Sequence, residues 1–324
     1  MRILLASKID PTTIDELSKQ HEVSTCFDGT QEELIAAIPG NEAIIFRSGV
    51  QISRPVMSAS PELRLLIRAG SGMDNIDLDY VNEKGLTLER IPQPGAKAVS
   101  ELSFAFMLSL ARELLKTDRL TREGAWPKHQ VKGRLLTGKT LGIVGYGNIG
   151  SRVGWMGAAW GMKVLGVRND AYPFPEIDVS DHDVEFTDLD DLLSRSDFVS
   201  IHCPLDDTTR GMIGARELSL MKPGSILVNL ARGGVVDEEA LLKELKDGSR
   251  LIGAATDVHA AEGPGEISPL AELDNVILTP HMGAMALEVQ SEIGGRILAL
   301  VDQYDSGDRS NGAETTEPSN VENN

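Results

Sequence analysis

Short apolar runs alternate with amphipathic segments along the first part of the chain. Five runs between residue 2 and about residue 92 have the length and apolar character of strands: RILLAS, EVSTCF, AIIFRS, LRLLIRAG and LTLERI. Three segments between them carry apolar residues at helical spacing: PTTIDELSKQ, QEELIAAI and LDYVNEKG. Strands that alternate with helices predict βαβ units and a mainly parallel sheet.

A second alternating series begins at Lys139, after a long apolar segment that starts at Ser100. Leu102, Phe106 and Leu110 in that segment recur at helical spacing, and Ser100 is expected to cap the helix. Six nearly all-apolar strand candidates follow: KTLGIVGYG, KVLGVR, DFVSIHC, SILVNLA, LIGAATDV and NVILTPH. The expected helices between them lie near residues 149–160, 189–194, 215–221 and 238–246, and a last amphipathic helix ends near residue 304.

The first strand of the second series runs into a glycine-rich loop. Residues 145–150 read G-x-G-x-x-G directly after LGIV and open a predicted helix, which is the context that a dinucleotide-binding loop requires. Gly145 permits a tight turn, Gly147 lets the backbone approach a pyrophosphate, and Gly150 lets helix and strand pack closely. The backbone amides of Asn148 and Ile149 would face the anion at the positive end of the helix. A glycine-rich turn without a ligand remains the alternative.

The choice between the two nicotinamide cofactors is usually made at the end of the next strand, KVLGVR. An acidic residue there binds the ribose hydroxyls, whereas an arginine accommodates a 2′-phosphate. This chain has Arg168 and Asn169 at that point, so the pattern favours NADP over NAD. The alternative is a solvated Arg168, with Asp170 on the ribose.

These patterns predict an α/β protein with two Rossmann-like, doubly wound parallel-sheet domains and an active-site cleft between them. We expect residues 100–284 to form the dinucleotide-binding domain. Residues 1–99 and 285–304 would form a discontinuous substrate-binding domain, with the crossings near residues 100 and 284. Residues 305–324 have no apolar period and are expected to form a disordered tail.

Composition limits the function and the compartment. A chain of 324 residues with 41% hydrophobic residues can bury a sizeable core. The net charge of −18 argues against a nucleic-acid or anionic-membrane partner. Cys26 and Cys203 are too few for a disulfide framework, no run reaches the ~18 apolar residues of a membrane span, and the opening MRILLAS is too short for a signal peptide. We therefore expect a soluble cytoplasmic protein, and we assign no metal site.

Polar residues follow three further strand candidates. Arg232 follows SILVNLA, Asp257 and Glu262 follow LIGAAT, and His281 follows NVILTP. Ligands of open α/β sheets lie beyond the carboxyl ends of the strands, so these side chains should converge there. Histidine can exchange a proton near neutrality, a carboxylate beside it fixes its tautomer, and a guanidinium can bind an α-keto acid through two contacts. The alternatives are a structural histidine, a surface glutamate and a loop-capping arginine.

This ordered set of motifs resembles the D-isomer-specific 2-hydroxyacid dehydrogenases, especially the D-3-phosphoglycerate dehydrogenase-like branch. The motifs that carry the resemblance are FRSG at Arg47, RAGSGMDNID from Arg68, SEL at Ser100, GKTLGIVGYGNIG, HCPL at His202 and the three segments above. After His281, where the family has glycine and small hydroxyl residues, this chain reads MGAMA, so its substrate choice can differ.

The resemblance implies roles for individual residues. Arg232 would bind the substrate carboxylate and carbonyl oxygen, His281 would be the acid/base, and Glu262 would orient His281. Asp257 would hold the nicotinamide carboxamide. Further cofactor contacts are implied at Tyr146, Gly147, Asn148, Ile149, Cys203, Pro204, Leu230, Ala231 and Gly283.

Substrate recognition is expected from the first domain and the hinge. Ser71 and Gly72 resemble the loop whose amides hold the substrate carboxylate, although an ordinary glycine turn would look the same. Arg47 resembles an arginine that binds a second anionic group, and Lys97 could add charge. Together with Arg232 they would favour a doubly anionic acid.

The predicted function is an oxidoreductase that transfers a hydride between NADP, or less favourably NAD, and a small D-2-hydroxy or 2-oxo acid. The acid could carry a phosphate or phosphonate, and the sequence leaves its identity open. A homodimer is expected through the apolar helix after Ser100, as in the similar family. The alternatives are a dinucleotide-sensing corepressor scaffold and formate dehydrogenase, both on the same fold.

Overall fold

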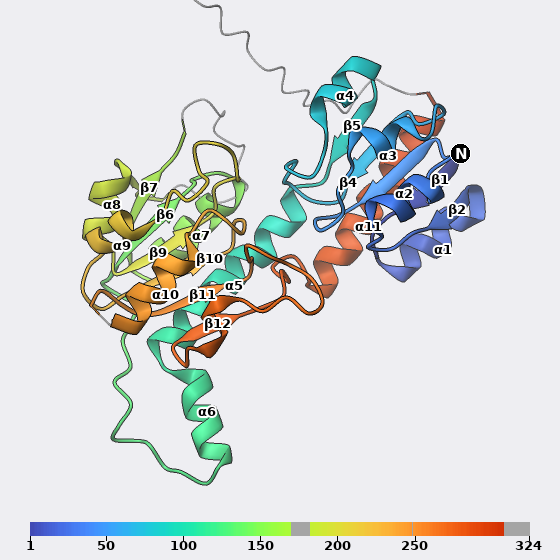
Figure 1. The fold of residues 1–324 in the computed structure, drawn as a ribbon. Coiled ribbons are helices and arrows are strands. Elements are labelled where there is room, and N and C mark those ends of the chain that lie inside the picture. Colours follow the sequence, from blue (N-terminus) through green and yellow to red (C-terminus); the bar gives the residue numbers. More distant parts are fainter. Residues whose placement is uncertain (170–181, 248, 308–324) are drawn as a thin grey trace, which may run out of the picture. The chain divides into compact units, whose positions relative to one another are not determined.

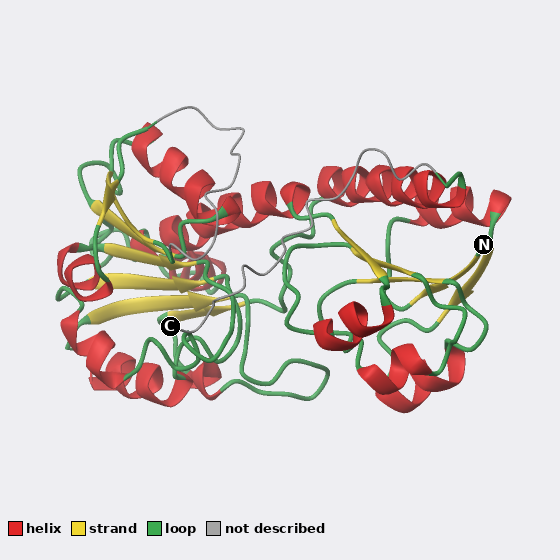
Figure 2. Ribbon diagram, turned by 90° about the horizontal axis from the view of Figure 1, so that it is seen from above, coloured by secondary structure: helices red, strands yellow, loops and turns green. Residues whose placement is uncertain are grey.

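The computed structural model describes residues 1–169, 182–247 and 249–307. Its contacts divide the chain into two compact units, Pro92–Val289 and a discontinuous unit of Met1–Ile91 with the residues from Gln290 onward. Each unit contains one parallel sheet with helices on both faces (Figure 1, Figure 2). The expected α/β class with two Rossmann-like domains is therefore confirmed.

The first unit is built on a five-stranded sheet in the order β2-β1-β3-β4-β5. The strands are β1 (Arg2–Leu5), β2 (Glu22–Thr25), β3 (Ala43–Phe46), β4 (Leu65–Arg68) and β5 (Thr87–Arg90). The helices are α1 (Pro11–Gln20), α2 (Gln31–Ala37), α3 (Arg54–Ser58), α4 (Leu78–Lys84) and α11 (Leu287–Asp305). Leu4, Ile44 and Phe46 pack with α2, α3 and α4 on one face. Helices α1 and α11 pack together, because Gly294 has no side chain where Thr13 lies against it.

The second unit is built on a seven-stranded sheet in the order β12-β11-β10-β9-β6-β7-β8. The strands are β6 (Thr140–Val144), β7 (Lys163–Val167), β8 (Glu185–Phe186), β9 (Phe198–Ile201), β10 (Ser225–Asn229), β11 (Leu251–Thr256) and β12 (Val276–Leu278). The helices are α5 (Gln93–Ala111), α6 (Leu114–Arg122), α7 (Asn148–Ala159), α8 (Leu189–Arg195), α9 (Ala215–Leu220) and α10 (Glu238–Asp247), with a 3-10 helix at Pro269–Glu272. Helices α5 and α7 pack in one apolar cluster, and α8, α9 and α10 pack in another on the opposite face. The strand order reverses between β6 and β9, which is where a doubly wound sheet opens a crevice for a ligand.

The apolar segment after residue 92 differs from the helix predicted for it. Helix α5 begins at Gln93, with Pro94 in its first turn, where proline is tolerated. Ser100 is therefore not an N-cap: it lies buried inside α5, and its hydroxyl donates to the Lys97 carbonyl. The chain then leaves the helical path at Glu113, whose φ of +52° separates α5 from α6.

The start of α5 also moves the division between the units. The units separate after Ile91 and after Val289, whereas the sequence placed the crossings near residues 100 and 284. The first turn of α5 belongs to the second unit, and Gly95 in this turn lies near Ala284 of the same unit. The names given to the two domains from the sequence remain predictions. Most of the predicted disordered tail, residues 308–324, lies outside the described residues.

No helix among the described residues has both the length and the apolar character needed to cross a membrane.

Candidate active site

The glycine-rich loop joins β6 to α7 at the reversal point of the sheet. Gly145 has a φ of +93°, and a Cβ there would lie 2.5 Å from the Cys203 amide nitrogen. A Cβ on Gly150 would lie 2.3 Å from the Gly145 carbonyl oxygen. A Cβ on Gly147 would meet no atom within 4 Å. No protein atom therefore requires glycine at this position, and its missing side chain leaves room in front of the α7 N-terminus. These three features fit a pyrophosphate bound by the amides of Asn148 and Ile149.

The side chain of Tyr146 is turned into the unit. Its hydroxyl lies 2.5 Å from His182 Nε2, and its ring meets Phe186 edge-on with centroids 5.2 Å apart. Burial raises the pKa of Tyr146 to about 12. Because the side chain is buried, the prediction that Tyr146 contacts a cofactor concerns its backbone.

Arg168 directly follows β7 and lies over the ring of Phe186 on β8. The guanidinium carbon is 4.9 Å from the ring centroid, which is within the range of a cation–π contact. The contact orients Arg168 at the strand end where a ribose substituent is read. Asn169 is the last described residue there, and Asp170 lies outside the described residues.

Two predicted cofactor residues follow β9. The backbone of His202 and Cys203 lies directly against Gly145, which puts residues 202–204 beside the glycine-rich loop. Burial raises the pKa of the Cys203 thiol to about 11, so this cysteine is not a nucleophile at neutral pH. Pro204 is exposed.

Arg232 lies in the turn that follows β10. The buried Asn229 shapes this turn: its Oδ1 accepts from the Ala231 amide at 3.1 Å, and its Nδ2 donates to the Arg232 carbonyl at 3.3 Å. The guanidinium also donates to the Ala231 carbonyl at 2.7 Å. Leu230 and Ala231 are buried, so their predicted cofactor contacts concern the backbone.

The Arg232 turn lies directly against the loop after β11 at Gly233. A Cβ on Gly233 would lie 1.8 Å from the His259 carbonyl oxygen. Only glycine fits between the two segments, which brings Arg232 and Glu262 to neighbouring loops.

Asp257 holds the turn that carries His281. Its Oδ1 accepts from the Thr279 hydroxyl at 2.6 Å and from the Met282 amide at 2.8 Å, and its Oδ2 accepts from the Gly283 amide at 2.7 Å. These bonds flank His281, whose φ of +53° is unusual for a residue with a side chain. Asp257 is only 2% exposed, so it supports the turn whether or not it also contacts a cofactor.

His281 and Glu262 form the central pair of the site. The Nδ1 of His281 lies 2.9 Å from Glu262 Oε2, and both side chains are partly exposed. Burial alone would raise the pKa of Glu262, but the hydrogen bond and positive charge of His281, with the His259 amide at 3.1 Å, hold that pKa below its ordinary value. The carboxylate is therefore ionised at neutral pH. A histidine whose Nδ1 is bonded to a carboxylate carries its proton there and presents Nε2 to a substrate.

All these segments lie at the carboxyl ends of parallel strands in the second unit, and so at one edge of its sheet. The described residues include no group of three or more histidine, cysteine or acidic side chains arranged to hold a metal ion.

Comparison with known proteins identifies the family. Residues 104–283 match the family model described as the NAD binding domain of the D-isomer specific 2-hydroxyacid dehydrogenases. A hydroxypyruvate reductase of Thermotoga maritima is 38% identical over 296 residues, which cover 90% of this chain and 94% of that protein. The chain belongs to the D-isomer-specific 2-hydroxyacid dehydrogenases. The expected enzyme class, an oxidoreductase acting on a CH–OH donor with a nicotinamide cofactor, is confirmed.

Two further relatives show how much of their length this dehydrogenase shares. A D-3-phosphoglycerate dehydrogenase of Methanocaldococcus jannaschii is 37% identical over 91% of this chain, but the chain spans only 55% of that relative. The crystal structure of an Aquifex aeolicus D-lactate dehydrogenase, complexed with NAD and lactic acid, superposes with a TM-score of 0.82 at 29% identity, covering 95% of this chain and 96% of that one. The alternative corepressor function is not favoured.

The predicted substrate residues fall in both units. In the first unit, Arg47 follows β3 and donates to Gln290 Oε1 at 2.6 Å, and burial lowers its pKa. The carbonyl of Gly72 accepts from Arg68 Nε at 2.9 Å, while no hydrogen bond from the amides of Ser71 or Gly72 is found within the described part of the chain. Lys97 lies on α5 and belongs to the second unit of the dehydrogenase. The roles given to these residues stay predictions.

The sequence did not reveal the residues that support the site. Asn229 and Thr279 are identified by their hydrogen bonds to the Arg232 turn and to Asp257. A buried asparagine at the end of an apolar strand was a signal, because such a polar group needs partners. Nothing in the local pattern marked Thr279.

The environment of His202 in this dehydrogenase predicts an acid-sensitive fold. Its Nε2 lies 2.7 Å from the Ser200 hydroxyl, its Nδ1 is buried without a partner among the described residues, and burial lowers its pKa to about 3. An unfolded histidine binds its proton near pH ~6.5. Between these values the unfolded chain binds a proton that the folded one does not. The free energy of unfolding should therefore fall below pH ~6.5, by up to about 1.4 kcal/mol per pH unit.

Urea unfolding at pH 7.5 and 5.5 measures this loss. His202→Asn, which cannot be charged, should reduce the difference between the two pH values by about 1 kcal/mol. His129→Asn, at an exposed position, should leave the difference unchanged. Equal pH dependence in His202→Asn and the wild type would show that His202 is not responsible.

Proposed function

We propose that this protein reduces a small 2-oxo acid to the D-2-hydroxy acid, or catalyses the reverse, and that NADP is its favoured cofactor. The observation that carries the proposal is the His281–Glu262 pair, 2.9 Å apart at the sheet edge that also holds the glycine-rich loop. A paired imidazole supplies the proton exchange that accompanies hydride transfer to a carbonyl.

The residues divide the chemistry among them. The glycine-rich loop and the amides of Asn148 and Ile149 would hold a reduced nicotinamide cofactor, which would supply the hydride for the carbonyl carbon of the substrate. His281, protonated on both nitrogens, donates its Nε2 proton to the oxygen, and Glu262 stabilises the imidazolium before that transfer. Arg232 binds the carboxylate and carbonyl oxygen and so opposes the negative charge that grows on the oxygen. In the oxidative direction the same groups act in reverse order.

The substrate class follows from the anion-binding groups. We propose that the Ser71 and Gly72 amides add to Arg232 in holding the carboxylate. Arg47 and Lys97 would bind a second anionic group, such as a phosphate or phosphonate. The relatives named hydroxypyruvate reductase and D-3-phosphoglycerate dehydrogenase suggest candidates with and without that group.

The test is the absorbance of reduced nicotinamide with NADH or NADPH and a panel of 2-oxo acids with and without phosphate or phosphonate. Turnover that yields the D-hydroxy acid supports the proposal, and a higher kcat/KM for a phosphorylated acid than for its parent supports a dianionic substrate. Tight cofactor binding without turnover of any acid would contradict the proposal.

Arg168 should control cofactor choice. Arg168→Asp is expected to lower kcat/KM with NADPH by about 10- to 100-fold, because a charge-assisted contact to the 2′-phosphate is lost, while NADH turnover is retained. Arg210→Asp introduces the same charge change at an exposed position and should affect neither cofactor. A wild-type enzyme that prefers NADH, with Arg168→Asp leaving its NADPH kinetics unchanged, would contradict the NADP assignment.

We also propose a homodimer in the cytoplasm. No residue of α6 is buried, and Leu115 on this helix and Trp126 after its end are 58% and 81% exposed. Apolar area of this kind favours a covering partner, and both cysteines are free thiols, which suits a reducing compartment. Light scattering after size exclusion should give twice the 35.0 kDa mass of the chain.

A further inference from the structure

The loop that carries Glu262 is exposed and has few internal bonds. All residues from 261 to 267 are exposed. Gly263 and Gly265 have φ values of +142° and +93°, and one internal bond joins the Glu266 amide to the Gly263 carbonyl at 3.2 Å. Such a segment does not fix the position of a carboxylate by itself. The carboxylate of Glu262 bonds directly to His281 and to the His259 amide, at 2.9 and 3.1 Å, and it keeps both partners only while the loop that follows residue 259 stays in place.

The carboxylate of Glu238 bonds to both ends of this loop. Glu238 is the first residue of α10, and its Oε1 accepts from the Ala260 amide at 2.7 Å. Its Oε2 accepts from the Ser268 hydroxyl at 3.3 Å. Ser268 in turn caps the following 3-10 helix, since its hydroxyl accepts from the Leu270 amide at 3.3 Å. One side chain therefore joins α10 to the beginning and the end of the Glu262 loop.

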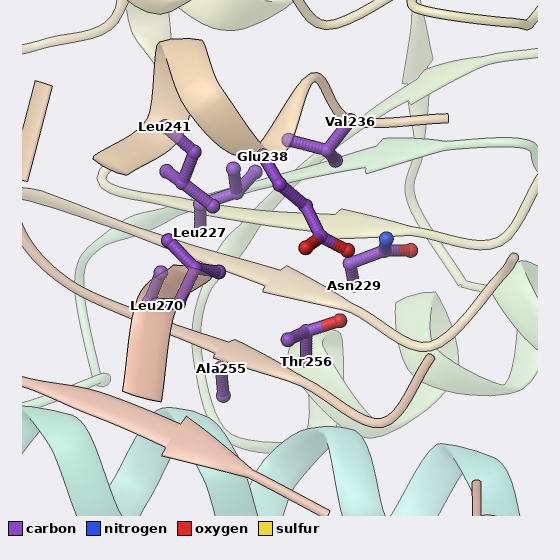
Figure 3. Close-up of a pocket in the computed structure, with 9 residues that line it drawn as sticks. Leu227, Asn229, Val236, Glu238, Leu241, Ala255, Thr256 and Leu270 are labelled. Atoms are coloured by element: carbon purple, nitrogen blue, oxygen red, sulfur yellow. The ribbon is translucent and has the colours of Figure 1, made fainter. Parts of the chain in front are cut away.

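Glu238 also lies at the polar end of a small cavity under the strand ends. The cavity is lined by Leu227, Asn229, Val236, Glu238, Leu241, Ala254, Ala255, Thr256 and Leu270. Figure 3 shows the Glu238 carboxylate directed toward Asn229 and Thr256, away from Leu227 and Leu241. Asn229 bonds to the Arg232 turn, and the Thr256 hydroxyl donates to the Val258 carbonyl at 2.5 Å. The three polar side chains of the cavity thus each support a loop of the site.

The geometry points to Glu238 as a positioning residue that keeps Glu262 against His281. Glu238 does not touch the reacting groups and acts through the Glu262 loop. The inference rests on the proposed function, in which Glu262 stabilises the imidazolium of His281. An acidic residue in the first turn of a helix also stabilises the helix by its charge alone. The test must therefore distinguish the effect of the length of the Glu238 side chain from the effect of its charge.

Four variants make that separation. Glu238→Ala removes both bonds but leaves α10 capped, because Asp237 accepts from the Glu239 and Ala240 amides at 3.1 Å. Glu238→Gln keeps the length and can still accept from Ala260 and bond to Ser268. Glu238→Asp keeps the charge but is one methylene too short to reach both ends. Glu239→Ala removes the neighbouring exposed carboxylate in the same helical turn and is the matched control.

Kinetics with the best 2-oxo acid give the first readout. Glu238→Ala and Glu238→Asp should lower kcat by about 10- to 100-fold, as expected when a support of an active-site group is lost, with KM for the cofactor unchanged. Glu238→Gln and Glu239→Ala should stay within about 2-fold of the wild type. In an enzyme that already carries Glu262→Gln, adding Glu238→Ala should lower kcat by less than about 2-fold. The reason is that both substitutions remove the same interaction, the one between Glu262 and His281. The inference would be overturned if the losses in kcat from Glu238→Ala and Glu262→Gln added up in the double variant. It would also be overturned if Glu238→Asp were active while Glu238→Gln was inactive.

Hydrogen exchange of the protein without cofactor or substrate gives a second readout that needs no turnover. Amides in a peptide covering residues 259–268 should exchange faster in Glu238→Ala and Glu238→Asp than in the wild type, Glu238→Gln or Glu239→Ala. Unchanged exchange would overturn the positioning role. If the wild type turns over no 2-oxo acid, the proposed function fails, and the exchange result still decides whether Glu238 holds the loop.

Discussion

Replacing His281 with alanine is expected to lower kcat for 2-oxo acid reduction by about 10²- to 10⁴-fold, the range of a lost general acid. The cofactor should still bind, because the glycine-rich loop and Arg168 do not depend on the imidazole. The Nδ1 of His281 is bonded to Glu262, so the loss concerns the proton that Nε2 delivers. Stopped-flow absorbance separates this step from cofactor binding, which fluorescence titration measures.

Glu262→Gln and His129→Ala are the companion variants. Glu262→Gln should lower kcat less than His281→Ala, since the imidazole remains but its charged partner is gone. The pKa of Glu262 is held below its ordinary value, so the carboxylate pairs with His281 at neutral pH and loses that pairing only as the pH falls through the lowered pKa. His129 is exposed, and its removal should change nothing. A His281→Ala enzyme with wild-type kcat would remove His281 from the mechanism.

The fold could be predicted from local patterns because its strands are buried on both faces. Each of the eleven strand candidates corresponds to a strand, although each run continues past the end of its strand, by one to three residues. The pattern did not predict β8 and α3. Strand β8 has two residues, both exposed, and α3 has five, so neither has an apolar period to detect.

The extent of α5 was mispredicted for a different reason. The sequence prediction started this helix at Ser100, yet proline suits the first turn of a helix, and the helix begins at Gln93. Its end at Glu113 depends on a left-handed backbone at a residue that does not favour it.

The candidate site could be predicted as far as its side chains follow strand ends. The resemblance to the family implied that Glu262 orients His281, and the structure brings the two side chains together. The supporting bonds could not be predicted, because Asp257, Asn229 and Glu238 act on residues two to thirty positions away through folded loops. The sequence predicts which groups carry the chemistry, whereas the structure identifies the bonds that hold those groups in place.

The Arg232 variants are expected to have the second largest effect. Arg232→Ala should lower kcat/KM for a 2-oxo acid by about 10²- to 10³-fold, because two charge-assisted hydrogen bonds to the substrate are lost. Arg232→Lys should recover only part of this, since an ammonium cannot form the planar two-bond contact. The Arg232 turn should keep its shape, because Asn229 bonds to its backbone rather than to the guanidinium.

Comparison of a 2-oxo acid with its amide makes the test specific to the carboxylate. The wild type should strongly prefer the acid, and in Arg232→Ala that preference should fall toward one. Added guanidinium chloride should restore part of the activity of Arg232→Ala, whereas Arg210→Ala, at an exposed position of the same unit, should need no rescue. If Arg232→Ala kept its preference for the acid, the carboxylate would be bound elsewhere, and the Ser71–Gly72 amides and Arg47 would become the first candidates.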